Sequence, residues 1–175
     1  MKNLRIFLIL LSLLAQPLLG SEKSSLYTVD MGKLFRSSDF GRKIISTNNI
    51  ARQELQKENE ELESLLLSEE KELSEQRKIL SADEFRPKAL AFDERVSIIR
   101  TEQIKKEENL KNKVRKEEAE FYKRIYPLLY ELLLDRGGLI LMDQRNVILW
   151  DNTVDITDEA ILLINQVLGT SITSN

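Results

Sequence analysis

The sequence predicts an α+β fold, in which a long antiparallel helical hairpin is inserted into a small β body that oligomerisation completes. Three observations lead to this prediction. Residues 41–126 carry a charge at nearly every second position and contain almost no glycine or proline. Short β-rich runs flank this stretch on both sides. The whole chain is 31% charged and only 6% aromatic, a composition that favours long helices over a sandwich or barrel.

Residues 1–20, MKNLRIFLILLSLLAQPLLG, are predicted to be a cleaved secretory signal peptide. Lys2 and Arg5 precede an apolar stretch from Ile6 to Leu14, which is the pattern of such a signal. The stretch is about half as long as the ~20 residues that a membrane-spanning helix needs, and no cysteine follows it to carry a lipid. After loss of these two positive charges, 24 basic and 29 acidic residues give the exported chain a net charge of −5.

Residues 21–40 form the first part of the predicted body. The run LYTV, from Leu26 to Val29, is short and rich in β-forming residues, which indicates a strand. Met31, Leu34 and Phe35 then recur at helical spacing before a break around Ser38 and Gly41. We therefore expect one strand followed by a short helix.

Residues 41–126 are predicted to be the hairpin arm. A thin apolar seam runs along the first half of the arm through Leu55, Leu62, Leu66, Leu73 and Leu80. Polar residues occupy the alternate seam positions, namely Asn48, Glu58, Glu69 and Gln76. Ser81 to Glu84 could form a capping box, but Pro87 is too deep for a straight helix that begins at this cap. We therefore place Pro87 in the first turn of a second helix and expect the tip at 81–86. The two arms, 41–80 and 87–126, would each be about 60 Å long at ~1.5 Å per residue.

Charge supports the pairing of these two helices. Residues 54–75 hold nine acidic and two basic side chains, whereas residues 95–116 hold eight basic and three acidic ones. Folding about the predicted tip places residue i opposite about 167 − i, so the acidic block faces the basic block. The basic stretch is therefore interpreted as half of an intramolecular ion-pair array, and no nucleic-acid site is expected in this acidic chain.

Residues 127–175 complete the predicted body. Pro127 is expected to interrupt the long helix, and an apolar turn or two then ends at Gly137 and Gly138. Two strands, Leu139 to Met142 and Val147 to Trp150, are predicted to form a hairpin. A final helix, capped by Asp155 or Thr157, carries Ile161, Ile164 and Leu168.

This small sheet would be apolar on both faces and would have open edges, so we expect copies of the chain to cover it. The residues assigned to the oligomer core are Tyr27, Val29, Leu139, Leu141, Val147, Leu149 and Trp150.

Catalysis is not expected. The chain has no cysteine and no histidine, which excludes thiolate nucleophiles, histidine-based triads and ordinary zinc sites. Asp155 and Asp158 could in principle act as an acid and base pair, but the context DITDE favours a helix cap and first-turn charges. No cofactor or metal is predicted.

These segments together resemble the Skp, or OmpH-like, family of periplasmic chaperones. The likeness rests on the signal peptide, on YTVDMGKLFRSSDFGRKI, on the long charged hairpin and on GGLILMDQRNVILWDNTVDITDE. The resemblance implies a periplasmic homotrimer whose helical arms enclose unfolded outer-membrane proteins. Family members are often strongly basic, so the acidic balance of this chain predicts more dependence on enclosure and apolar contact, and it leaves membrane contact open.

The candidate client-contact residues lie along the distal half of the arms: Leu66, Leu73, Leu80, Phe85, Leu90 and Phe92. Leu80 and Phe92 fit equally well as parts of the hairpin seam. The alternative function is a structural spacer or adaptor of the cell envelope, since a coiled hairpin of ~60 Å can also act as a spacer.

Overall fold

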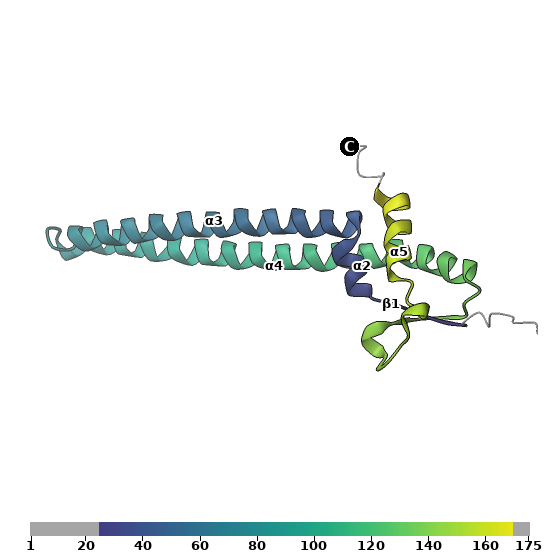
Figure 1. Ribbon diagram of the computed structural model, residues 1–175. Coiled ribbons are helices and arrows are strands. Elements are labelled where there is room, and N and C mark those ends of the chain that lie inside the picture. Colours follow the sequence, from purple (N-terminus) through teal and green to yellow (C-terminus); the bar gives the residue numbers. More distant parts are fainter. Residues whose placement is uncertain (1–24, 170–175) are drawn as a thin grey trace, which may run out of the picture.

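The computed structural model describes residues 25–169 and shows a small body from which one long helical hairpin extends (Figure 1). The predicted α+β class with a long hairpin is confirmed. The predicted signal peptide at 1–20 lies outside the described residues.

The body begins with strand β1, Leu26–Val29, as the sequence predicts, and helix α2, Met31–Ser37, follows at once. Asp30 ends the strand and starts the helix, because its carboxylate accepts a hydrogen bond from the backbone N–H of Lys33 at 2.8 Å. Leu34 points into the core from this helix and is fully buried.

Helix α3, Asp39–Gln76, forms the first arm, and Ser38 is its N-cap. The Ser38 hydroxyl accepts a hydrogen bond from the N–H of Gly41 at 3.2 Å. Gly41 lies so close to α2 that an added Cβ would be 1.9 Å from the carbonyl oxygen of Phe35. This contact explains the glycine at the break between the two helices.

Helix α4, Ala82–Asp135, forms the second arm and continues into the body. Ser81 and Glu84 make a complete capping box at its start. The tip of the hairpin is therefore the turn at 77–81, and the prediction of a tip at 81–86 is wrong. Capping by Ser81 fixes the helix start, so Pro87 lies inside the helix rather than in its first turn.

Pro127 does not interrupt α4, contrary to the prediction. A proline inside a helix removes one backbone donor and leaves the carbonyl four residues earlier, here that of Lys123, without its partner. Pro127 is exposed, so water can reach this carbonyl. Packing of the flanking turns holds the helix, because Ile125 and Leu129 are both buried in the core.

Strand β2, Ile140–Asp143, pairs with β1 in parallel, with Leu26 opposite Ile140 and Val29 opposite Asp143. The predicted hairpin partner at 147–150 is not a strand within this chain. Asp143 caps a 3₁₀ turn at Gln144–Asn146, which directs the chain away from β2. Residues 147–150 therefore have no strand partner among the residues that the structure describes.

Helix α5, Thr157–Ile164, and a π-helical turn, Asn165–Gly169, close the body. Asp155 accepts a hydrogen bond from the N–H of Thr157 at 2.9 Å, and the Thr157 hydroxyl accepts one from the N–H of Asp30, also at 2.9 Å. These bonds join the last helix to the end of β1. The main core contains Val29, Leu34, Phe121, Ile125, Leu129, Ala160 and Ile164.

Candidate functional site

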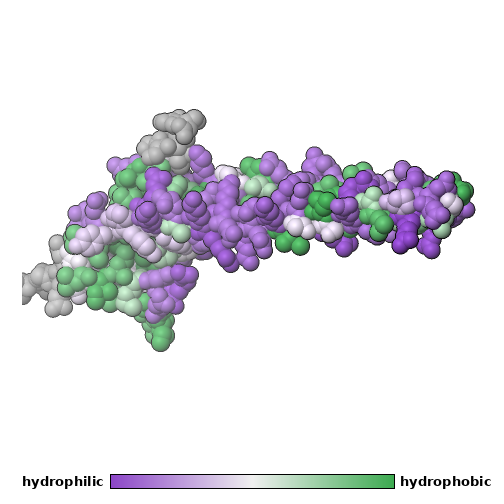
Figure 2. Space-filling model, turned by 180° about the vertical axis from the view of Figure 1, so that it is seen from behind, coloured by the Kyte–Doolittle hydropathy of each residue, from purple (hydrophilic) through white to green (hydrophobic). Residues whose placement is uncertain are grey.

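The body exposes many large apolar side chains. Figure 2 shows hydrophobic residues gathered over the body, whereas the arm is mostly hydrophilic with scattered hydrophobic spots. Trp150 is 42% exposed, and its neighbour Leu149 is 87% exposed. The other large exposed apolar residues of the body are Tyr126, Tyr130, Leu134, Leu139, Ile140, Ile148, Leu162 and Val167. An apolar surface of this extent indicates an interaction site.

The predicted oligomer-core residues fall into two groups. Tyr27 and Val29 are already buried within their own chain, against the helices of the body. Leu139, Leu149 and Trp150 are exposed, and the remaining two, Leu141 and Val147, are half-buried. Burial by other copies of the chain stays a prediction for the exposed residues. The apolar character of Tyr27 and Val29 is already explained by the core of their own chain.

Sequence reasoning missed the contribution of α4 to this surface. Tyr122, Tyr126 and Tyr130 are spaced four residues apart, and the rings of Tyr122 and Tyr126 stack with their centroids 6.4 Å apart. This i, i+4 spacing of tyrosines was a visible signal, because it places the rings on one face of a helix.

A hollow of about 640 Å³ lies between α4 and the strands, lined by Tyr122, Tyr126 and Leu139 among others. Asp143 and Arg145 form its polar rim through an ion pair of 2.6 Å. The hydrogen bond from Arg145 lowers the pKa of the Asp143 carboxyl. Burial, with the nearby carboxylate of Glu118, raises the pKa of the Tyr122 hydroxyl.

On the arms, five of the six predicted client-contact residues lie half-buried along the seam between α3 and α4. They are Leu66, Leu73, Leu80, Phe85 and Phe92. Leu90 alone among the six is exposed, with 61% of its surface accessible to solvent. Packing in the seam between the two helices accounts for the apolar side chains of Leu80 and Phe92, and no client contact is needed to explain them.

Apart from Leu90, the sequence prediction did not include the large apolar residues that are exposed on the arms. These are Ile50, Leu65, Leu67, Ile79, Ile98 and Ile104. They lie outside the heptad-like seam, so a search for apolar residues at heptad spacing does not find them. A search for large apolar residues on the otherwise charged, outward-facing sides of the two helices would have found them.

Polar contacts cross the seam at several levels. Gln103 donates a hydrogen bond to Asn59 at 3.2 Å, and Lys106 pairs with Glu58. Arg95 and Glu69 form an ion pair with a distance of 2.9 Å between nitrogen and oxygen. Facing residues therefore follow about 164 − i instead of the predicted 167 − i, because the tip turn comes earlier than expected.

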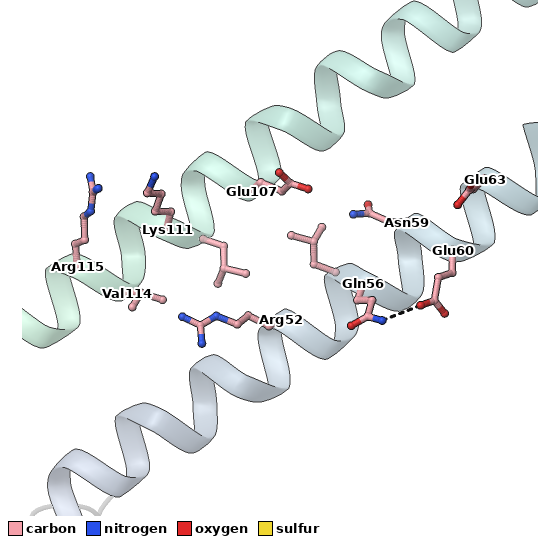
Figure 3. A pocket seen from close by; sticks show the side chains of 11 residues that line it. Arg52, Gln56, Asn59, Glu60, Glu63, Glu107, Lys111, Val114 and Arg115 are labelled. Atoms are coloured by element: carbon pink, nitrogen blue, oxygen red, sulfur yellow. Dashed lines mark hydrogen bonds between the residues drawn. The ribbon is translucent and has the colours of Figure 1, made fainter. Parts of the chain in front are cut away.

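Two hollows of about 680 and 720 Å³ follow one side of the hairpin. They share Asn59, Glu63 and Glu107 in their walls, so they are parts of a single groove. Figure 3 shows the part nearer the body, where Arg52 extends from α3 across the space between the helices toward Val114 of α4.

Among residues 25–169, no group of three or more metal-ligating side chains comes together. In the same range, no helix is both long and apolar enough to cross a membrane.

Comparison with known proteins gives one family and one fold. The family model "Outer membrane protein (OmpH-like)" matches residues 25–163. The fold is similar to the crystal structure of a proposed outer membrane chaperone (OmpH-like) from Caulobacter crescentus CB15, with a TM-score of 0.77 and 15% sequence identity. The match covers 82% of this chain and 85% of that chain. The search of curated proteins finds no match.

Proposed function

The chain belongs to the OmpH-like outer membrane protein family, a chaperone family, and from this premise we propose that it is a periplasmic holdase for unfolded outer-membrane proteins. The holdase binds its client between helical arms and prevents aggregation. This function requires only a surface that binds segments of the client, so that these segments do not associate with one another.

The observation that carries this proposal is the position of the exposed apolar residues on the arms. Ile79 is 81% exposed near the tip, and Leu67 and Ile104 are each 59% exposed in the middle of the arm. Such residues contribute little to the hairpin itself, since they lie off its seam. Exposed apolar side chains on a well-charged, soluble helix can bind apolar segments of an unfolded chain without making the chaperone aggregate.

We further propose that the body joins three copies. In the described part of the chain, the outer edge of β2 has no strand partner, and the outer edge of β1 is bridged only by Thr28 to Asp155. Sheets of this size rarely persist alone. Val147 has an extended backbone, with φ −117° and ψ 128°, so the segment at 147–150 can act as a strand in an oligomer. Pairing between copies would close the edges and cover Trp150 at the same time. The number three comes from the family resemblance.

Charge supports enclosure over long-range electrostatic capture. Residues 41–126 hold 19 basic and 19 acidic side chains, so the arm has no net charge. Surface charges are screened within ~8 Å at physiological ionic strength. We therefore expect client binding to survive moderate salt.

A deletion of residues 60–105 tests the function. Asn59 and Lys106 lie at the same level of the hairpin, as the contacts Asn59–Gln103 and Glu58–Lys106 show, so a short turn can join them without strain. The mature protein and the deletion variant would each be mixed with a urea-unfolded outer-membrane barrel protein, and light scattering would follow its aggregation. We expect the deletion variant to keep the oligomer and to lose protection.

Protection by the shortened protein would show that the arms are not the binding element. Failure of both proteins to bind any unfolded barrel protein would favour the spacer or adaptor function instead. The polar contacts across the seam already argue against a rigid spacer, because such a spacer gains from a continuous apolar seam.

A further inference from the structure

The two helices of the arm carry opposite charge, but they use little of it to bind each other. Residues 54–75 of α3 hold nine acidic and two basic side chains, and residues 95–116 of α4 hold eight basic and three acidic ones. Only two ion pairs join these blocks, both of which lie in the described part of the chain: Arg95–Glu69 and Lys106–Glu58. Most of the charged side chains therefore make no ion pair across the seam.

Charges alternate along the outer sides of the two helices, in opposite order. The α3 triplet is Glu54, Lys57 and Glu60, and the α4 triplet is Lys105, Glu108 and Lys111; all six side chains are exposed. Lys57 is two residues from the seam residue Leu55, and Glu108 is two residues from Leu110, so each is turned about 200° away from the seam. Figure 3 shows Glu60 and Lys111 extending from their helices on opposite outer sides of the hairpin.

These charges have few partners within their own chain. The α4 triplet makes no ion pair among residues 25–169. In the α3 triplet, Lys57 has an exposed contact of 3.6 Å to Glu61 of the same helix, and Glu60 accepts a hydrogen bond from Gln56 at 2.8 Å. Exposed contacts of this kind are weak, so both triplets remain available to another molecule.

The two triplets lie at the same height along the arm. Facing residues of α3 and α4 follow about 164 − i. Glu54 is therefore level with Lys111 to within about one residue, and the same relation matches the other two charges of each triplet. At all three levels the two charges are opposite in sign. They cannot meet within one chain, because the hairpin itself lies between them.

A neighbouring copy can bring the two triplets together. Copies in a closed ring are related by rotation, and arms that enclose a client run along the rotation axis. A given residue then has the same height in every copy. Each arm can present α3 to one neighbour and α4 to the other, so that opposite charges face each other at three successive levels.

We propose that the α3 triplet of one copy pairs with the α4 triplet of the next copy, and that this contact draws the empty arms together. The partner is thus a second copy of this chain, and the inference rests on the oligomer and the holdase function proposed above. Because the six side chains are exposed, their pairing is weak and is screened by salt. The arms separate when salt is raised or when a client fills the space between them.

The contact is confined to the middle of the arm. Nearer the tip, Glu72 of α3 is about level with Asp93 of α4, so like charges would meet there. The closed arms therefore touch at the level of the triplets and diverge toward the tip.

Distances between the arms test this contact. The chain has no cysteine, so Ser74→Cys gives each arm of the full mature protein a single site for a spin label. Double electron–electron resonance would measure the distances between labels at about 0.01 M and about 1 M salt, where the screening length is about 30 Å and about 3 Å. We expect the mean distance to increase by about 10 Å, one helix diameter, at high salt.

Reversal of the α3 triplet should open the arms. Glu54→Lys, Lys57→Glu and Glu60→Lys together place like charges opposite the α4 triplet of the next copy. We expect this triple variant to show the longer distance already at low salt, and raising the salt should not lengthen the distance further. Far-UV circular dichroism and light scattering would establish that it keeps its helices and its oligomer.

Reversal of both triplets is the matched control. Lys105→Glu, Glu108→Lys and Lys111→Glu, added to the triple variant, restore opposite charges at all three levels and the net charge of the unchanged protein. We expect this sixfold variant to regain the short distance at low salt and its increase at high salt. A merely local effect of the α3 substitutions would persist in the sixfold variant.

An arm separation that ignores salt, in a protein that light scattering shows to be an oligomer, would overturn this inference and leave the holdase function standing. A triple variant that still closes at low salt, or a sixfold variant that stays open, would overturn it as well. A monomeric mature protein would instead overturn the proposed oligomer and this inference together.

Discussion

A phenylalanine near each end of α4 faces α3, but the two phenylalanines differ in how deeply they are buried. Phe121, near the body, is fully buried, and its ring packs edge-on against Phe35 with centroids 4.9 Å apart. Phe92 occupies the equivalent seam position toward the tip and is only half-buried. The difference arises because Phe121 is covered by helices from three parts of the chain, whereas Phe92 is covered only by α3. The body therefore has a core, and the arm has only a seam.

The largest expected effect is on the Phe121→Ala variant, which should lower the free energy of unfolding by about 3–5 kcal/mol. Removal of the Phe121 ring would leave a cavity, and the surrounding core is packed too tightly to fill it. Phe92→Ala is the matched change in the arm and should cost clearly less, since water reaches the site. Urea titrations followed by circular dichroism would measure both, and equal losses would mean that the arm is packed like the body.

The next effect concerns assembly. Trp150→Ala should weaken association of the copies by roughly 3 kcal/mol per site, because the large exposed ring is expected to be buried between subunits. Light scattering over a dilution series would measure it. Ile79→Ala removes an even more exposed apolar side chain, but at the tip of the arm, and should leave assembly unchanged. A Trp150 variant that assembles normally would place this ring outside the interface.

A smaller effect of opposite sign is expected where the arm meets the body. Asn48 is only 3% exposed, and its side-chain oxygen has no hydrogen-bond partner. Asn48→Leu should therefore raise the free energy of unfolding by about 1 kcal/mol, because the desolvated amide is removed. Asn49→Leu makes the same change on the adjacent exposed position and controls for helix propensity. Destabilisation by Asn48→Leu would indicate that the amide has a partner in solution.

The smallest effect is local to the tip. Ser81→Ala removes the capping box of α4 and should cost about 1 kcal/mol there. Hydrogen exchange should show faster opening at 77–90 and unchanged protection around Phe121, since the distal arm opens independently of the core. Ser74→Ala, which removes no cap, is the control. Faster exchange around Phe121 and at the tip together would instead show that the hairpin and the body unfold as one unit.

Much of the fold could be predicted because it depends on local patterns. The strand at 26–29, the break around Ser38 and Gly41, and the apolar seam all follow from short-range spacing. Opposite charge on the two arms predicted their pairing, and ion pairs such as Arg95–Glu69 show it. The exact register was missed by about three residues, because it depends on where a capping box places the tip.

The sequence by itself determined the class of the molecule, the presence of the hairpin and its charge pairing, because periodicity and capping act within a few residues. The tertiary structure decided three further features. Pro127 stays inside a helix because Ile125 and Leu129 are held in a core built from distant segments. Residues 147–150 lie outside the sheet because the 3₁₀ turn at Gln144–Asn146 directs the chain away from β2. One side of the arm is hollow, because the packing of α3 against α4 brings Asn59, Glu63 and Glu107 into the walls of one groove.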